Sequence, residues 1–566
     1  YCCPDVASKL TKAANFSLNP CRNFVLYTCH NWLTHRNRIS NKHSPETVHR
    51  SAISGRFGSA AGQTIFAFHR SCLHTIGRGS ELPARAMSAL LEAINMSRGM
   101  APVDVLRILI QLSVLYQLYT PIKVDVRFDA ASSVSTLVVQ SNPVPPFSDS
   151  EFMDVHKDML TTFNQKLRVT MSTEEFLSLK EKLHTSNQKG QQYVVKTFAP
   201  LDSLVASVSK RQWLAMAAPF HYFPPPTVLS YSDIGHIRGT LHLLTTDSKE
   251  RREVQMALLV IMAGVHLIRN YKYRVPIGES TALFRYCGEL TDDLASSWRI
   301  LTKQELTDPQ KDDVVRSLYD EIKNAVVLDM QKLFDPADWT AAGRVLFSVR
   351  LVLPADLIPR DVSVPILGEN FYSNVLEMKL YSMAEQKRLV ELGFDLLYDY
   401  DVFNTNPEPL GKNAVLMPSM SYSLLRFVKG TDPAVNAADV GAQMAFFLWR
   451  VLFDSKDWTS ATRDRIKDHH ECSTGNVSKS RKRRVPMGYT MYRLSLHSAV
   501  DAVRTQGPEW HLPLYVWSTS RLSRAQMFYM DFTFKYCPIA MNDSRAVTMI
   551  NALLPSIRDF REAYAC

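Results

Sequence analysis

Histidines beside carboxylates are the residues of this chain that could do chemistry, and that chemistry would be zinc-assisted hydrolysis. A zinc hydrolase needs two imidazoles one helical turn apart with a glutamate beside them, because positions i and i+4 share a helix face. The chain has 16 histidines. The run "HHE" (469–471) has no further histidine at the needed offset, and "HIRGTLH" (236–242) spaces its histidines six apart. No HExxH occurs, so we interpret the histidines as scattered surface and core residues.

Motifs for other chemistries are absent as well. The sequence has no GxSxG, no Walker loop and no GxGxxG. A cysteine–histidine nucleophile would need a free thiolate, which a cysteine in a disulfide cannot supply. Motifs alone therefore predict no catalytic site.

The nine cysteines indicate the compartment. They gather at the two ends of the chain with two lone ones between, and no CxxC pair supports a thiolate zinc site. This layout is typical of long-range disulfides in an oxidising compartment. Four Asn-x-Ser sequons agree with it, at Asn15, Asn95, Asn476 and Asn542. We therefore expect a secreted, extracellular glycoprotein.

Length and charge narrow the class further. At 566 residues the chain is too long for one core, so two or three domains are expected. A net charge of +10 spread over this length does not favour a dedicated nucleic-acid binder. One basic cluster exists, "SKSRKRR" (478–484), and three interpretations stay open for it: a solvated loop, a site for proteolytic cleavage at 481–484, or a polyanion patch.

Two features concern membranes and processing. The longest apolar stretch, residues 254–268, is shorter than the roughly 20 residues that cross a bilayer, which favours a buried core helix and no transmembrane segment. The chain opens at "YCCPD" without an initiator methionine or a signal-peptide pattern. We expect a processed chain from which an upstream signal peptide or membrane anchor could have been removed.

Helical periodicity dominates the secondary structure. Apolar residues recur at intervals of three and four in several segments, which predicts helices over 84–94, 102–118, 173–183 and 313–334. Alternation predicts a strand over 123–129 and, more weakly, over "LSLHSAV" (494–500). The fold class is therefore mostly α with minor β.

The stretch "NPCRNFVLYTCHNWL" (19–33) resembles the entry motif of the neprilysin and endothelin-converting enzyme family of zinc endopeptidases, the M13-type peptidases. Four later stretches resemble that family's landmarks in the same order, namely "LFDPADWTAAGRVLFSVRLVLP" (333–354), "KNAVLMPSM" (412–420), "RLSRAQMFYMDFTFKYC" (521–537) and "LLPSIRDFREAYAC" (553–566). The resemblance implies a two-lobed fold that encloses a central cavity and is held by long-range disulfides. It implies a thermolysin-like lobe of residues 1–28 plus about 370–566, and a mostly helical covering lobe of about 29–369, with linkers crossing between them.

The family's disulfide scheme implies three pairs in this chain. They are Cys21 with Cys566, Cys29 with Cys537, and Cys72 with Cys287. Cys2, Cys3 and Cys472 stay unassigned, and one of them could cross-link to another chain.

The family's zinc helix is similar to "VGAQMAFFLWRVLFD" (440–454) in this sequence. In that register the first zinc histidine is replaced by Phe446, the catalytic glutamate by Phe447 and the second histidine by Arg450. A phenyl ring offers zinc no lone pair, and a guanidinium is a permanent cation that repels it. No histidine lies between residues 401 and 468 that a shifted register could use.

The remaining parts of the family's machinery also differ. The third zinc ligand falls on Tyr492 and the aspartate behind it on Leu496. The oxyanion-stabilising histidine and the substrate-clamping arginine fall near Asp543 and Met549, while the substrate-backbone motif falls near Asp401. Arg545 lies close enough in sequence to replace the clamp, so Asp401 and Arg545 are the candidate substrate-binding residues.

The resemblance therefore implies a secreted pseudopeptidase without a metal or other cofactor. We expect it to bind a peptide or protein in the cavity between the lobes, or to regulate an active family member, with no nucleic-acid partner. The alternative is a structural or storage glycoprotein whose cavity is plugged by Phe446 and Phe447. A remote alternative is an active zinc metalloendopeptidase.

Overall fold

The computed structural model describes most of the chain. The described residues are 10–34, 45–77, 81–96, 101–129, 134–142, 147–186, 193–220, 225–232, 234–245, 249–271, 280–358, 363–391, 402–410, 413–423, 432–455, 457–481, 486–506, 509–517, 520–537 and 544–566. The other residues, which include Cys2 and Cys3, lie outside this description.

The chain forms two compact units that differ in their bounds from the expected lobes. Unit 1 comprises Tyr1–Arg50, Arg299–Asp361 and Tyr398–Cys566, and unit 2 comprises Ser51–Trp298 and Val362–Leu397. The segment 299–361, expected in the covering lobe, belongs to unit 1, because its long helix α14 (Pro309–Leu333) packs against α19 and α21. The central cavity between the lobes stays a prediction.

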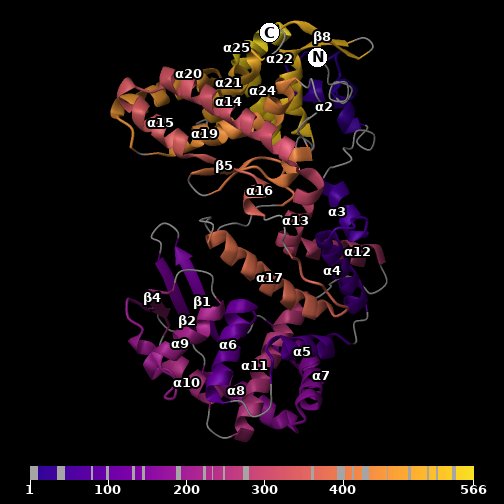
Figure 1. The fold of residues 1–566 in the computed structure, drawn as a ribbon, viewed down its shortest axis with the longest axis vertical. Helices are drawn as coiled ribbons and strands as arrows, with labels where there is room; N and C mark the ends of the chain where they lie inside the picture. Colours follow the sequence, from indigo (N-terminus) through magenta and orange to yellow (C-terminus); the bar gives the residue numbers. More distant parts are fainter. Residues whose placement is uncertain are drawn as a thin grey trace. The chain divides into compact units, whose positions relative to one another are not determined.

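Unit 2 is built around one apolar helix, α11 (Lys249–Asn270), which packs against helices α5, α7 and α8 (Figure 1). The helix is longer than the apolar run expected from the sequence. Part of it, Arg252–Asn270, is long and apolar enough to cross a membrane, but 72% of its apolar window is buried inside the unit. That burial is the property of a core helix.

The other helices of unit 2 surround this core, and a small sheet lies beside them. The helices are α4 (Ala60–Ile76), α5 (Leu82–Ala93), α6 (Pro102–Ile110), α7 (Asp149–Leu167), α8 (Thr173–Ser186), α9 (Lys210–Ala217), α10 (Ile234–Thr245), α12 (Ser280–Glu289) and α17 (Phe371–Glu391). The helix expected over 102–118 is divided, because α6 continues as a π-helical turn, η3 (Gln111–Leu115), and then ends. The helix predictions for 84–94 and 173–183 are confirmed by α5 and α8.

The sheet of unit 2 has four strands in the order β1-β2-β4-β3. They are β1 (Ile122–Asp129), β2 (Val134–Ser141), β4 (Val228–Tyr231) and β3 (Tyr193–Val195). Strands β1 and β2 are antiparallel and β2 and β4 are parallel. The strand predicted over 123–129 is thus confirmed as β1, since its alternating valines enter the core.

Unit 1 is also mainly helical. Its helical elements include α2 (Phe24–Thr34), α14, α15 (Trp339–Ser348), α18 (Pro433–Asn436), a π-helical turn η9 (Ala437–Gly441), α19 (Ala442–Asp454), α20 (Ser460–Arg481), α21 (Gly488–Arg504), α22 (Arg524–Phe534), α24 (Ser544–Leu553) and α25 (Arg558–Tyr564). A small sheet consists of β5 (Arg350–Val352), β7 (Ala414–Leu416) and β6 (Glu408–Pro409), in that order. A hairpin consists of β8 (Pro513–Trp517) and β9 (Ser520–Ser523). The strand expected at 494–500 is wrong, because this segment lies inside α21. Its apolar residues face α19 and α14 on two sides, so their spacing resembled alternation.

Three disulfides join segments that are far apart in sequence. They are Cys21–Cys566, Cys29–Cys537 and Cys72–Cys287, the pairs that the resemblance implies. The first two lie in unit 1, where Cys21–Cys566 ties the turn before α2 to the end of the chain, and Cys29–Cys537 ties α2 to the segment after α22. The third joins α4 to α12 within unit 2. Among the described cysteines, Cys472 is free and exposed.

Candidate functional site

The segment that resembles a zinc helix is α19, and it packs along α21 in unit 1, with α14 against both (Figure 1). Phe446 on α19 faces Tyr492 on α21, and their ring centroids lie 4.3 Å apart. These are the two positions where the resemblance places the first and third zinc ligands. The structure therefore brings together two residues that are 46 positions apart in sequence and replaces ligand atoms with a contact between two rings.

The register of these helices is held by a buried chain of hydrogen bonds on another side of α19. Trp449 Nε1 donates to Ser498 Oγ at 3.1 Å, and Ser498 Oγ donates to Asp329 Oδ2 at 2.9 Å. Trp449 comes from α19, Ser498 from α21 and Asp329 from α14. Since all three side chains are buried, the chain fixes how the helices lie against one another.

The other positions equated with zinc-peptidase residues offer no metal ligand. Phe447 and Leu496 are buried in the core of unit 1. The side chain of Arg450 is 52% exposed and pairs with Asp454 one turn further along α19, at 3.3 Å. The side chains at these positions do not fit a zinc ion, because they supply no imidazole and no carboxylate where the ion would sit.

Tyr492 is the one residue here whose oxygen could act as a ligand, and its surroundings keep it neutral. Burial raises the pKa of Tyr492, although a hydrogen bond with Tyr536 opposes this. Burial likewise raises the pKa of Tyr536, whose hydroxyl also lies 3.5 Å from Gln443 Nε2 on α19. Two neutral phenols and an amide therefore form a hydrogen-bonded group beside the Phe446 ring, with no anion among them.

A charged cluster lies at the far end of the Trp449–Ser498 chain. The carboxylate of Asp329, 6% exposed, accepts from His497 Nδ1 at 3.1 Å and pairs with Lys332 Nζ at 2.7 Å. Although burial raises the pKa of Asp329, hydrogen bonds from His497, Lys332 and Ser498 outweigh it and hold the pKa below its ordinary value. The hydrogen bond to Asp329 raises the pKa of His497, although burial opposes this. The cluster is an internally satisfied ion-pair network.

The remaining candidate residues are dispersed or lie outside the described chain. Arg545 is exposed and Met549 half-buried on α24, which packs against α21. Asp401 and Asp543 lie outside the described residues, so both stay predictions.

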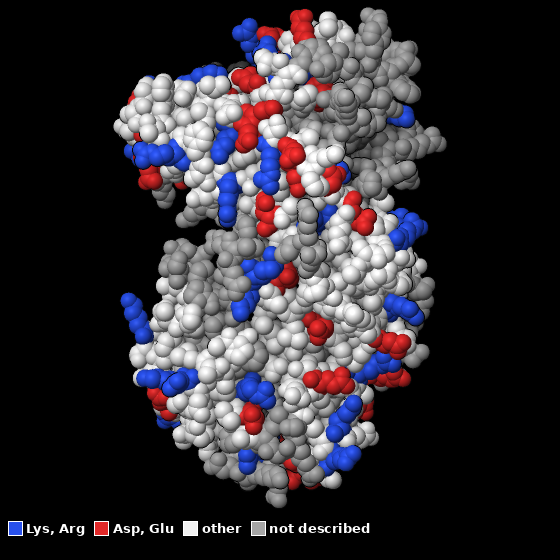
Figure 2. Space-filling model, viewed as in Figure 1, with Lys and Arg blue, Asp and Glu red and all other residues white. Residues whose placement is uncertain are grey.

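The sequons and the basic segment also stay predictions. Asn15 is half-buried and accepts a hydrogen bond from Ser17 N, whereas Asn95 is exposed with a φ of 48°. Asn476 belongs to α20, and Asn542 lies outside the described residues, as do 482–484 of the basic segment. Over the coloured part of the face in Figure 2, positive and negative side chains are interspersed, which does not favour a polyanion site there.

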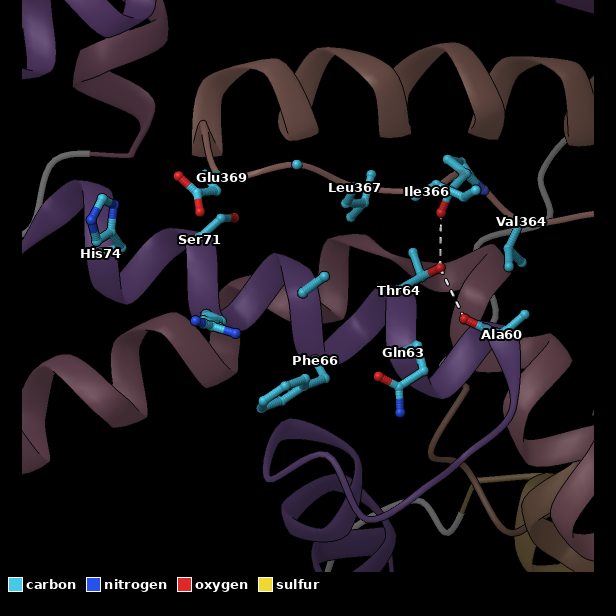
Figure 3. Close-up of a pocket in the computed structure, with 14 residues that line it drawn as sticks. Ala60, Gln63, Thr64, Phe66, Ser71, His74, Val364, Ile366, Leu367 and Glu369 are labelled. Atoms are coloured by element: carbon cyan, nitrogen blue, oxygen red, sulfur yellow. Dashed lines mark hydrogen bonds between the residues drawn. The ribbon is translucent and has the colours of Figure 1, made fainter.

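A cavity of about 560 Å³ lies in unit 2 between α4 and the extended segment 364–369 (Figure 3). Thr64 Oγ1 donates to the carbonyl of Pro365 at 2.9 Å and so holds this segment along α4. His74 and Glu369 lie at one end of the cavity, and the buried Nδ1 of His74 has no hydrogen-bond partner. Ile366 on the segment is fully exposed. The cavity is thus lined by apolar side chains such as Ile366 and Leu367 along one side and by the polar side chains of His74 and Glu369 at one end.

Sequence reasoning missed one further cluster in unit 1, formed by His511, Asp559 and Glu562. Asp559 and Glu562 lie three residues apart on α25, a spacing that places both on one helix face. His511 precedes Asp559 by 48 residues and Glu562 by 51, in the segment before β8, and no sequence signal links it to them.

The fold that carries these residues is that of the neprilysin-type zinc metalloproteases. It is similar to the zinc metalloprotease Zmp1 of Mycobacterium tuberculosis in its open state, with a TM-score of 0.60 at 14% identity over 97% of each chain. The inhibitor complex of that protein gives 0.52 at 13% identity, over 98% of this chain and 96% of that one. A Haemonchus galactose-containing glycoprotein complex gives 0.51 at 11% identity, over 99% and 96%. No family model and no curated protein matches the sequence. At these identities the likeness establishes the fold.

Proposed function

We propose that this chain is a secreted pseudopeptidase, a zinc-metalloprotease fold that binds peptides or proteins without cleaving them. The observation that carries the proposal is the contact between Phe446 and Tyr492, at 4.3 Å between ring centroids. These rings stand where the resemblance places two zinc ligands. A hydrolase of this type needs a metal-bound water and a carboxylate base at that place. Buried Phe447, at the position of that base, cannot accept a proton.

Secretion is supported by the disulfides. Cys21–Cys566 and Cys29–Cys537 close loops that span almost the whole chain, and such bonds persist in oxidising compartments. The four sequons agree with this location. One structural neighbour is a galactose-containing glycoprotein complex, and by analogy with it we propose a protein partner.

Binding is supported by the cavity along α4. Its volume of about 560 Å³ lies within the roughly 300–1,000 Å³ of ligand pockets. Arg70 and His74 line it together with the apolar side chains of Ile366 and Leu367. We propose that it holds a short peptide whose apolar side chain packs on residues 366–367 and whose acidic group faces Arg70.

Peptide hydrolysis tests the inactivity. We expect the full chain, supplied with Zn²⁺, to cleave no member of a fluorogenic peptide library above the rate without protein. The triple variant Phe446→His/Phe447→Glu/Arg450→His should also be inactive, because Tyr492 still occupies the third ligand position. Chelator-sensitive cleavage by the natural chain would overturn the proposal.

Peptide capture followed by mass spectrometry tests the binding. We expect enriched peptides to carry an acidic group and an apolar residue, and Arg70→Glu to weaken their capture at least tenfold. Arg107→Glu, an exposed arginine on α6, is the matched control and should leave capture unchanged. No enrichment by the natural chain would favour the structural glycoprotein instead.

A further inference from the structure

The cluster of His511, Asp559 and Glu562 has the dimensions of a metal site. His511 Nε2 lies 3.6 Å from Asp559 Oδ1 and 3.8 Å from Glu562 Oε2. Both distances exceed those of ordinary hydrogen bonds. Two ligands of one tetrahedral zinc ion lie roughly 3.3–3.6 Å apart, given zinc–nitrogen and zinc–oxygen bonds of about 2.0–2.2 Å. The two distances from His511 Nε2 are close to this separation, and all three ligand atoms lie within 4.8 Å of one another.

Two atoms of this cluster are buried without a hydrogen-bond partner. They are Nε2 of His511 and Oδ1 of Asp559, the atoms that face each other. A buried polar atom without a partner is costly, so an unsatisfied facing pair calls for a group between them. A divalent cation satisfies both, since neutral imidazole and carboxylate are its ordinary ligands.

Each carboxylate is oriented by other side chains through its second oxygen. Asp559 Oδ2 accepts from Trp510 Nε1 at 3.0 Å and from Tyr529 OH at 3.1 Å, which leaves Oδ1 toward His511. Arg558 Nε donates to Glu562 Oε1 at 2.7 Å, which leaves Oε2 toward His511. Such outer hydrogen bonds fix the direction of metal ligands.

The two segments that carry the three proposed ligands are both held in place by contacts with α22. Trp510, next to His511, is buried, and its carbonyl accepts from Ala525 N at the start of α22. Helix α25 is anchored to α22 by Gln526 Nε2, which donates to the carbonyl of Ala563 at 2.9 Å. Phe560 of α25 packs in the core against Tyr529. The three ligand atoms are thus positioned by two elements that are both tied to α22.

The cluster around Asp329 in unit 1 differs, because its carboxylate is already hydrogen-bonded and ion-paired. There, Asp329 is hydrogen-bonded by His497 and Ser498 and paired with Lys332, whose ammonium already supplies the positive charge. In the cluster of His511, Asp559 and Glu562, Arg558 pairs with Glu562 Oε1 at 2.7 Å, but Asp559 Oδ1 and His511 Nε2 have no hydrogen-bond partner among the described residues.

That cavity, about 370 Å³, is lined by Asp559 and Glu562 together with Arg504 and Tyr529. It gives the cluster an open side. We propose that His511, Asp559 and Glu562 bind one zinc ion through one nitrogen and two oxygens, with a fourth position open to this cavity. Arg504 and Arg558 there would favour an anionic group, such as a carboxylate, as the fourth ligand.

Zinc titration of the full chain tests this site. The chain carries Cys472→Ser to remove the free exposed thiol at that position. It is stripped with chelator before calorimetric titration with Zn²⁺ and native mass spectrometry.

We expect one zinc per chain. His511→Gln should weaken binding at least 100-fold, and Tyr529→Phe, which acts through Asp559, about 10-fold. His242→Gln, at an exposed histidine on α10 of unit 2, is the matched control and should change the affinity less than threefold. Circular dichroism verifies that each variant is folded.

The outcomes separate this site from the proposed function. No binding at micromolar zinc, or equal binding by His511→Gln, would overturn the site and leave the pseudopeptidase proposal untouched. Zinc lost in Tyr492→Phe but retained in His511→Gln would place the ion at α19 and α21 and overturn both. Zinc lost in His511→Gln, without peptide cleavage by the natural chain, supports both.

Discussion

At the scale of single residues, unit 1 has aromatic side chains at positions where the family resemblance implies zinc-binding and catalytic groups. Phe446 and Tyr492 meet through their rings, and Phe447 is buried. The polar residues that remain nearby are satisfied by one another, as the hydrogen-bonded chain from Trp449 to Asp329 shows. The helices therefore keep their packing although the ligand atoms are missing.

The first prediction concerns Phe447. Phe447→Glu would place a carboxylate at a buried position of the core, and we expect the free energy of unfolding to fall by about 3–5 kcal/mol. Urea unfolding measures the change. Arg450→Glu, on the exposed side of the same helix, is the control and should cost less than about 1 kcal/mol. An equal loss in both variants would contradict the burial argument.

The second prediction concerns the pH dependence that His497 contributes. Its folded-state pKa is raised, so its stabilisation is complete below the ordinary histidine pKa and is lost as the pH rises through the raised value. The pKa of Asp329 is lowered, so its part is lost only in acid. Since the His497 side chain is 53% exposed, we expect His497→Gln to lower the free energy of unfolding by roughly 0.5–1 kcal/mol at pH 6 and less at pH 9.

Urea unfolding at both pH values measures this difference. Arg450→Gln is the matched control, because it removes an ion pair with Asp454 that contains no histidine. A His497→Gln effect that is equal at both pH values would contradict the prediction.

At the scale of elements, one glycine in each unit allows neighbouring helices of the core to pack closely. In unit 1, α19 follows the π-helical turn η9, and its Gly441 lets α14 approach, since a Cβ there would lie 3.2 Å from Ile322 Cδ1. In unit 2, Gly264 of α11 faces α7 and α5, where a Cβ would lie 2.5 Å from Met159 Cε. Glycine permits these approaches because it has no side chain.

The third prediction uses this contact. Gly264→Ala should lower the free energy of unfolding by about 1–2 kcal/mol, since Met159 must move away inside a packed core. Gly239→Ala, on α10, has no heavy atom within 4 Å of the new Cβ and should instead stabilise by about 0.5–1 kcal/mol. Urea unfolding compares the two. A gain in stability from Gly264→Ala would contradict the assigned contact.

At the scale of the whole molecule, each unit has its own disulfides. Cys72–Cys287 closes a loop within unit 2, and Cys21–Cys566 closes one that contains nearly the entire chain. A disulfide stabilises mainly by restricting the unfolded chain, so each acts on the unit whose residues it joins.

The fourth prediction follows from that division. Cys72→Ala/Cys287→Ala should lower the stability of unit 2 by about 2–4 kcal/mol. Hydrogen exchange should show loss of protection in α4 and α12 and unchanged protection in α19 and α21. Cys472→Ser, which removes a free thiol, is the control and should leave both units unchanged. Equal loss of protection in α19 would contradict the assignment of this disulfide to unit 2 alone.

The sequence predicted local structure well and some tertiary features through resemblance. Periodicity located α5, α8, α14 and β1, because the burial of one helix face or one strand face leaves a pattern in neighbouring residues. The same reasoning made 494–500 a strand, since a helix buried on two sides loses its simple pattern. The lobe bounds differed because the packing of α14 on α19 and α21 is not encoded locally.

The sequence by itself determined which residues stand in the zinc-helix segment, and hence that its helix offers no imidazole. Through the family resemblance it also implied the three disulfide pairs found in the structure. Only the tertiary structure decided that Phe446 meets Tyr492, and that His511 lies beside Asp559 and Glu562. The sequence gives the type of each residue directly. The contacts between Phe446 and Tyr492 and between His511 and Asp559 join residues 46 and 48 positions apart, so they depend on how the elements pack in three dimensions.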